Sequence, residues 1–162
     1  YSRLYSAHSQ LPDFLVNTHT VADATDLRNY IARLRGMPAL LDRAIERTRA
    51  SQEAGIKPPR FQIETVMTGS RKLISGAPYG EGPDAALWAD VKAKTAALVA
   101  AGKLPQAEAD TLLGEARAAI LALAPAYERV IAWAEASLPD APSGKVGALT
   151  LPGGDDYYAA QL

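Results

Sequence analysis

Histidine, serine and acidic residues are the side chains of this sequence that could take part in catalysis or bind a metal ion. The only histidines are His8 and His19, and neither is followed by the Glu and second His of a zinc-binding helix. A Ser–His–Asp triad assembles in space rather than by spacing, but the Gly-x-Ser-x-Gly elbow that would point to one is absent. We expect both histidines to have surface or packing roles, and we assign no catalytic, metal-binding or cofactor-binding residues.

Two glycine-containing stretches are superficially similar to ligand loops. Gly69-Ser70-Arg71-Lys72 lacks the Gly-x-x-x-x-Gly-Lys-Ser/Thr frame of a phosphate loop, so we interpret it as a helix irregularity. Gly153-Gly154-Asp155-Asp156 offers two carboxylates, whereas a calcium loop needs more oxygen ligands at fixed intervals. A turn that caps a following helix is the simpler interpretation of the second stretch.

The charge distribution gives little reason to expect a nucleic-acid partner. Seventeen basic and eighteen acidic residues leave a formal net charge of −1, so no overall field attracts polyanions. Without a recognition motif or interleaved stacking aromatic residues, we favour a solvated, salt-bridged helix face over a nucleic-acid site. The strongest contrary hint is a concentration of arginines at Arg28, Arg33, Arg35, Arg43, Arg47 and Arg49.

Other compositional features limit the class of protein. No apolar run approaches the ~20 residues that a membrane-spanning helix needs, so we predict no membrane span in this chain. The absence of cysteine excludes disulfides and thiolate chemistry but fits an exported protein as well as a cytoplasmic one. The chain starts at Tyr1 without an initiator Met or export signal and stops at Leu162 without a helix-ending signal, so we expect it to be part of a larger protein.

Apolar residues recur at helical spacing through the first half of the sequence. Leu27, Tyr30, Ile31 and Leu34 form one stripe, which predicts a helix over 25–35 that Asp23 or Thr25 could cap. Gly36-Met37-Pro38 is expected to break this helix, and a second one is predicted over 38–54 with Gly55 at its C-terminal end. A third helix is expected to start near Arg60, after two prolines.

The second half contains a long loop and two further helical patterns. Glycines and prolines predict a loop over 75–83, and a clear stripe that ends at Gly102 predicts a helix from about 87. Pro105 opens the longest pattern, which extends to about Ser137. Pro125 lies inside it, so we expect one bent helix or two abutting helices. Trp88, Tyr127 and Trp133 lie on or beside these stripes and are interpreted as packing residues.

Together these patterns predict an all-α fold, an antiparallel bundle-like arrangement of about five helices with a proline-kinked long helix and Pro/Gly-rich loops. We divide the chain into an irregular N-terminal segment at 1–22, a helical domain at 23–137 and a Pro/Gly-rich connector at 138–162. At most one short strand is expected in the connector, at 146–151.

Four stretches together resemble the bacterial family catalogued as domain of unknown function 885. They are Asp26–Leu34 with the following Met37-Pro38, the turn Gly55–Arg60, Pro125-Ala126-Tyr127 within a long helix, and Leu151–Tyr158. Their order and spacing agree from about Thr20 to the end of the chain. Members of this family are longer, and their later half resembles zinc metallopeptidases.

The resemblance implies that this chain is the helical region before a zinc-binding catalytic half. The zinc ligands of the family have no matching positions here, so the chain itself holds no cofactor and zinc is expected in the missing C-terminal region. We expect the helical region to be non-catalytic, to form a wall of a peptide-substrate cleft, and to self-associate through apolar surface exposed by the missing half. A non-enzymatic helical binding module is the alternative, and nucleic-acid binding ranks last.

Overall fold

The structure is a computed structural model that describes residues 7–143. Over these residues the fold is all-α, as predicted, and the only β pairing is an isolated bridge between Ala77 and Asp84. In chain order the elements are α1 (Ala7–Asp13), the π-helix η1 (Phe14–Thr18), α2 (Ala24–Glu53), α3 (Arg60–Leu73), α4 (Ala86–Ala100), α5 (Gln106–Leu121) and α6 (Ala124–Ser137).

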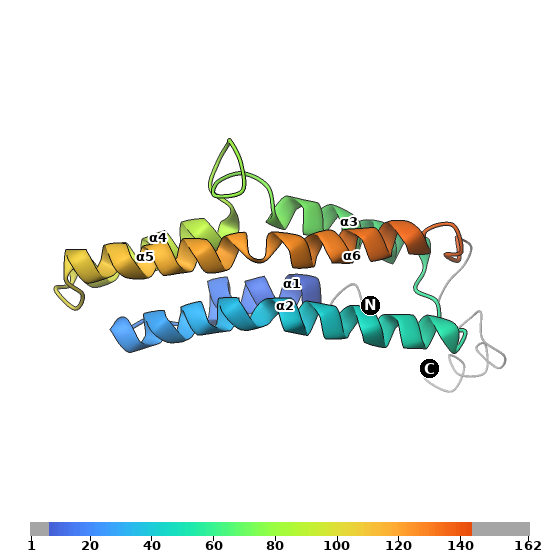
Figure 1. The fold of residues 1–162 in the computed structure, drawn as a ribbon, viewed down its shortest axis with the longest axis horizontal. Coiled ribbons are helices and arrows are strands. Elements are labelled where there is room, and N and C mark those ends of the chain that lie inside the picture. Colours follow the sequence, from blue (N-terminus) through green and yellow to red (C-terminus); the bar gives the residue numbers. More distant parts are fainter. Residues whose placement is uncertain (1–6, 144–162) are drawn as a thin grey trace, which may run out of the picture.

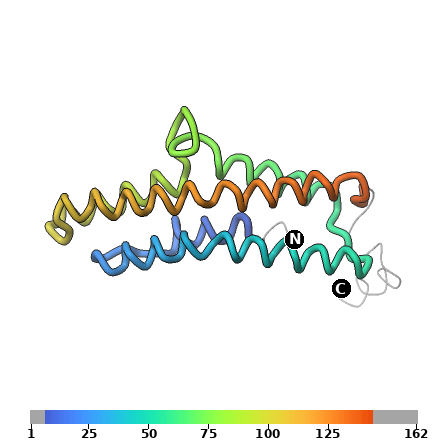
Figure 2. Tube along the Cα trace, in the orientation of Figure 1, coloured from blue at the N-terminus to red at the C-terminus, as the bar shows by residue number. Residues whose placement is uncertain are grey.

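The helices form an elongated bundle in which α2 and the α5–α6 pair run in one direction and the α3–α4 pair runs in the other (Figure 1). The long α2 forms one side, and α5 followed by α6 runs parallel to it, because Arg28 pairs with Glu108 and Arg35 with Glu115 in the same order along both helices. α3 packs against α6 and α4 against α5, and these two helices run in the opposite direction, one after the other (Figure 2). The short α1 packs against both α2 and α3 and completes the bundle over part of its length.

The core follows the apolar stripes that the sequence predicted. Leu27, Tyr30, Ile31 and Leu34 of α2 are all buried, and so are Tyr127 and Trp133 of α6. Trp88 is only partly buried but packs against the same core. The helical stripes therefore meet in one continuous hydrophobic cluster, whose burial is the main favourable term for this fold.

The predicted break at Gly36-Met37-Pro38 is wrong, because α2 continues through all three residues. Pro38 has no N–H to donate, so one helical hydrogen bond is missing at this point. Leu34, Met37 and Leu41 are nevertheless buried, and α2 packs against both α5 and α6. Tertiary packing on both sides of the proline thus outweighs the local cost of about 3 kcal/mol.

The predicted ends of α2 are confirmed. The Asp23 carboxylate accepts a hydrogen bond from the backbone N–H of Asp26 at 2.9 Å, which caps the first turn. At the other end Gly55 adopts a positive φ of 85°, a conformation that glycine adopts at little steric cost.

The long helical pattern with Pro125 is divided into the two abutting helices α5 and α6, one of the two predicted outcomes. Ala122 and Leu123 lie between them, and Pro125 falls in the first turn of α6. The missing N–H of a proline is harmless in a first turn because no helical partner exists for it there. Pro125 therefore marks a start of a helix, whereas Pro38 is accommodated inside one.

The expectation of an irregular segment at 1–22 is wrong for Ala7–Thr18, which are helical as α1 and η1. Leu15 is 1% exposed, and the ammonium of Lys94 donates to the backbone carbonyl oxygens of Leu15 and Val16 at 2.7 and 3.3 Å. Contacts with α4, far away in the sequence, therefore stabilise helical turns that local sequence patterns did not indicate.

The predicted loop between α3 and α4 is present and projects from the side of the bundle (Figure 1). The Tyr79 hydroxyl donates to the carbonyl oxygen of Ile120 at 2.9 Å, and the N–H of Ala85 donates to the carbonyl oxygen of Ala77 at 2.7 Å. The first bond holds the loop on α5, and the second joins the two arms of the loop. Residues 144–162 of the connector predicted over 138–162, with its strand at 146–151, lie outside the described residues.

Candidate functional site

The most concentrated group of ionisable side chains lies where η1 meets α2 and α4. Asp90 accepts a hydrogen bond from the Tyr30 hydroxyl at 2.8 Å and forms an ion pair with Lys94 at 2.8 Å. Lys94 also lies over the Tyr30 ring, 5.1 Å from its centroid. Burial, followed by the bond to Asp90, raises the pKa of Tyr30 far above its usual range, so this phenol stays protonated and acts as a donor.

His19 extends this network toward the surface. Its Nδ1 lies against the Arg33 guanidinium, which has only donors, so this nitrogen must accept. Its Nε2 lies 3.3 Å from the backbone oxygen of Asp26 and therefore carries the proton. Burial lowers the pKa of His19, which is consistent with a neutral ring between these partners.

Tyr30, Asp90 and Lys94 bond to one another, and the side chains of Asp90 and Lys94 are only 13% and 19% exposed. A general base would need to reach a substrate proton, whereas these groups are directed at η1, α2 and α4. The arrangement therefore fixes the π-helix to the bundle, which agrees with the packing role expected for His19.

His8, the other histidine considered from the sequence, is also a packing residue. It is 5% exposed, and burial lowers its pKa to about 4. The Tyr127 hydroxyl donates to the His8 backbone oxygen at 2.8 Å. Gly69 lies beside the imidazole, where a β-carbon would be 3.4 Å from Nε2. The predicted irregularity at Gly69-Ser70-Arg71-Lys72 is wrong, because α3 is regular there and Gly69 allows α1 to approach closely.

The arginines in the first half of α2 have partners within the described bundle, whereas Arg47 and Arg49 in the second half have none there. In the first half, Arg28 and Arg35 form ion pairs with α5, and Arg33 contacts His19 and stacks 5.2 Å from the centre of the Phe14 ring. This is the salt-bridged face that the sequence predicted. In the second half, the guanidinium groups of Arg47 and Arg49 have no ion-pair or hydrogen-bond partner among residues 7–143.

A surface pocket of about 420 Å³ lies between the end of α2 and the start of α3. We call it the α2–α3 corner. A second hollow of about 320 Å³ lies on the other side of Lys57 and Pro58, which line both. Side chains that line the corner include Arg47, Ser51, Ile56, Lys57, Pro58 and Gln62.

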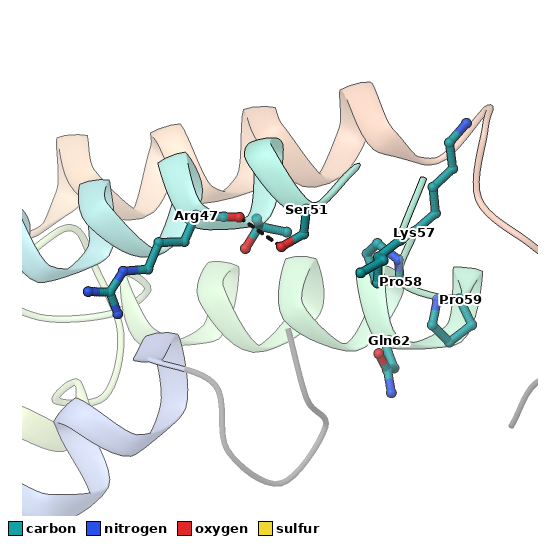
Figure 3. A pocket seen from close by; sticks show the side chains of 8 residues that line it. Arg47, Ser51, Lys57, Pro58, Pro59 and Gln62 are labelled. Atoms are coloured by element: carbon teal, nitrogen blue, oxygen red, sulfur yellow. Dashed lines mark hydrogen bonds between the residues drawn. The ribbon is translucent and has the colours of Figure 1, made fainter. Parts of the chain in front are cut away.

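The side chains of the corner have hydrogen-bonding capacity that the scaffold does not use. Figure 3 shows Arg47 and Lys57 at its two ends, with Ser51 between them and Gln62 below Pro58. The Ser51 hydroxyl donates to the Arg47 backbone oxygen at 3.0 Å and keeps its acceptor capacity. Within the described part of the chain, the Gln62 amide and the Lys57 ammonium have no partner. The corner is thus a polar surface pocket whose charged lining residues are both cations.

The sequence did not indicate this pocket, although its residues fall in the turn Gly55–Arg60 that the family resemblance uses. Two prolines beside a lysine predict a helix break and nothing more. The pocket arises because α3 packs on α6, which holds the start of α3 at a fixed distance from the end of α2. That packing involves residues distant in sequence.

The described residues contain neither a metal-binding cluster nor a helix that could span a membrane. Among residues 7–143, no group of three or more His, Cys, Asp or Glu side chains could hold a metal ion. None of the described helices combines the length and the apolar character that crossing a bilayer requires, which agrees with the prediction of no membrane span.

Comparison with known proteins supports the resemblance seen in the sequence. No curated protein and no solved structure matches the chain. The family model described as "Bacterial protein of unknown function (DUF885)" matches residues 1–162, the whole length of the sequence. The chain therefore belongs to this bacterial family, domain of unknown function 885.

Proposed function

We propose that this chain is the non-catalytic helical part of a larger zinc-dependent hydrolase that acts on peptides, and that it forms a wall of the substrate cleft. The resemblance of the family's later half to zinc metallopeptidases supports the hydrolase assignment. In such a site the metal polarises a carbonyl group and activates water, while the surrounding protein positions the substrate and excludes solvent. Positioning is the role proposed for the helical bundle.

The observation that supports this proposal is that some polar groups of the bundle are buried in packing contacts, while others at its surface have no partner among the described residues. The histidines and the Asp90–Lys94 pair are committed to packing, whereas the α2–α3 corner retains unused donors at the surface. A wall that contacts substrate without reacting with it would have this combination, because uniform binding lowers KM without changing kcat.

The test uses the full-length gene product. Intact mass and bound zinc are measured on the same sample, and peptide hydrolysis is then compared between the wild type and an Arg47→Glu/Lys57→Glu variant. We expect about one zinc per protein, and a KM raised several-fold at unchanged kcat. A matched charge reversal on the same helix, Arg43→Glu, should leave both constants unchanged. A metal-free, inactive product would reject the proposal.

The alternative is a non-enzymatic helical binding or interaction module. It is favoured by the continuous core, which gives the bundle the means to fold and bind without a catalytic half. A partner that binds the 162-residue chain and the zinc-depleted full-length product equally well would support this alternative over the hydrolase.

Self-association remains a separate expectation. The large exposed apolar side chains of the described region are Phe14, Leu40, Ile56 and Phe61, which are 42%, 42%, 71% and 44% exposed. Sedimentation equilibrium of the 162-residue chain tests this expectation, and a monomer at all concentrations would contradict it.

A further inference from the structure

We propose that the α2–α3 corner binds an extended, acidic peptide segment. This inference deepens the proposed function, since it names the charge class of the peptide that the helical wall would contact. It rests on that function only for the identity of the peptide as a substrate. The binding itself uses residues of this chain alone.

Charge is the first argument. The lining of the pocket contains the cations Arg47 and Lys57 and no carboxylate, although the whole chain has a net charge of −1. The neighbouring hollow differs, because Glu53 and Asp140 line it together with Lys57. Of these two hollows, the one between α2 and α3 therefore has the excess of positive charge, which would attract an acidic segment and repel a basic one.

The second argument is that these cations are not used by the fold. Several other basic residues of the bundle form ion pairs, as Arg28 does with Glu108 and Arg129 with Asp42. Within residues 7–143, no such partner exists for the side chains of Arg47 and Lys57. A ligand carboxylate would therefore meet cations without displacing an existing ion pair.

The positions of the two cations determine the shape of the ligand. Arg47 lies on α2 and Lys57 on the connector, and they extend from opposite ends of the pocket (Figure 3). A single phosphate or carboxylate would contact one of them, whereas an extended chain with separated negative charges would contact both. Two polar residues also line the pocket. Ser51 offers an acceptor and Gln62 offers both a donor and an acceptor, which suits the alternating N–H and C=O groups of a peptide backbone.

An exposed apolar side chain in the pocket lining provides the third argument. Ile56, which lines the pocket together with Pro58 and Pro59, is 71% exposed. Apolar contact area beside free cations favours a peptide that carries hydrophobic as well as acidic residues. A purely polar polyanion would leave this surface in water.

Binding to the 162-residue chain is measured by isothermal titration calorimetry with two synthetic peptides of equal length. One alternates Glu with Leu, and the other alternates Lys with Leu. We expect saturable binding of the acidic peptide, at least tenfold weaker binding of the basic one, and loss of affinity as salt rises. Equal affinities for the two peptides would overturn the proposal.

Charge reversal at Arg47 and Lys57 locates the site. The Arg47→Glu/Lys57→Glu variant should bind the acidic peptide about tenfold more weakly, since each reversal removes an attraction and adds a repulsion at an exposed site. Arg43→Glu, on the same helix but outside the pocket lining, should change affinity less than about twofold. If both variants lost the same affinity, the peptide would be attracted by the overall positive charge of α2, and the proposed site would be rejected. Circular dichroism and thermal unfolding confirm that each variant folds.

Two further outcomes distinguish peptide binding at the corner from the proposed hydrolase function and from self-association of the chain. If the full-length protein lacks zinc and peptidase activity but the acidic peptide binds at the corner, the proposed function fails and the inference stands. If the reversed variant loses dimerisation instead of peptide binding, the corner is an interface between copies of the chain and the inference is wrong.

Discussion

Ser70 is a small polar residue on the buried face of α3, and its hydroxyl oxygen has no hydrogen-bond partner. The residue is 0% exposed, so water cannot replace the missing partner. An unsatisfied buried hydroxyl costs about 1–3 kcal/mol. The hydroxyl therefore opposes folding, while the small size of the residue suits close helix packing.

We predict that Ser70→Ala raises the free energy of unfolding by about 1 kcal/mol, because alanine keeps most of the volume and removes the buried oxygen. Urea unfolding followed by circular dichroism measures the change. The matched control is Thr95→Val, which removes a buried hydroxyl that donates to the Val91 carbonyl at 2.7 Å and should bring no gain. Destabilisation by Ser70→Ala would mean that the hydroxyl has a partner in solution.

His8 gives the fold a pH dependence whose sign follows from burial. Its pKa in the folded protein is lowered to about 4 from the ordinary 6.5, so the unfolded chain takes up a proton first as the pH falls. The stabilisation is fully present above pH 6.5 and is lost as the pH falls toward 4. Over this interval the loss amounts to about 3 kcal/mol.

A His8→Gln variant should therefore unfold with a smaller dependence on pH between 7.5 and 4.5 than the wild type, by about 3 kcal/mol over the interval. Urea midpoints at several pH values provide the measurement. His19 and the carboxylates titrate in both proteins, so the difference between the two curves isolates His8. Parallel curves would show that His8 is solvent-accessible in the folded state.

At the scale of the helices and loops, Gly36 and Gly76 differ in whether the backbone requires a glycine. Gly36 lies inside α2, where a β-carbon would meet nothing within 4 Å. Gly76 has a positive φ of 75°, and a β-carbon there would collide with the Pro83 carbonyl oxygen. The same substitution should therefore have opposite effects at the two positions.

We predict that Gly36→Ala stabilises the protein by about 0.5–1 kcal/mol, since alanine loses less backbone entropy in a helix. Gly76→Ala should destabilise it by more than about 1 kcal/mol, because alanine disfavours the positive φ and the Pro83 backbone must move. Differential scanning calorimetry of both variants compares them directly. A loss of stability in Gly36→Ala would mean that the glycine provides a bend that α2 requires beside Pro38.

Element boundaries were predictable where a local signal determines them. Asp23, Gly55 and Gly102 each end a helix through their own hydrogen bonds or backbone angles, so the sequence alone located these ends. Pro38 and the segment Ala7–Thr18 were mispredicted because distant helices decide their structure. Propensity is a weak guide wherever tertiary contacts on both sides of a residue favour another conformation.

At the scale of the whole molecule, the candidate site was less predictable than the fold. The all-α class follows from periodicity, which each helix carries in its own sequence. The α2–α3 corner exists only because α3 packs on α6 and leaves the end of α2 beside Gln62. A pocket between two helices depends on how these helices are placed relative to each other. Apolar periodicity shows which face of a helix is buried but not which helix packs against that face, so the sequence does not specify the pocket.

Ion pairs that join α2 to α5 and α6 allow a last prediction about the assembled bundle. Arg28–Glu108, Arg35–Glu115 and Asp42–Arg129 connect these parallel helices at intervals along their length. All are substantially exposed, so each contributes only about 0.2–1 kcal/mol. The Arg129 hydrogen bonds lower the pKa of Asp42, so the contribution of its pair is present at neutral pH and is lost as acid protonates this carboxylate.

An Arg28→Gln/Arg35→Gln/Asp42→Asn variant should therefore lose about 1–3 kcal/mol of unfolding free energy at low salt, and much of this difference should disappear at 1 M NaCl. The control is Arg43→Gln/Arg49→Gln, which neutralises two cations of the same helix that form no ion pair within residues 7–143 and should leave stability nearly unchanged. Urea unfolding at both salt concentrations measures the four values. A loss that persists at high salt would show that the aliphatic parts of these side chains, packed between the helices, stabilise the parallel pairing more than their charges do.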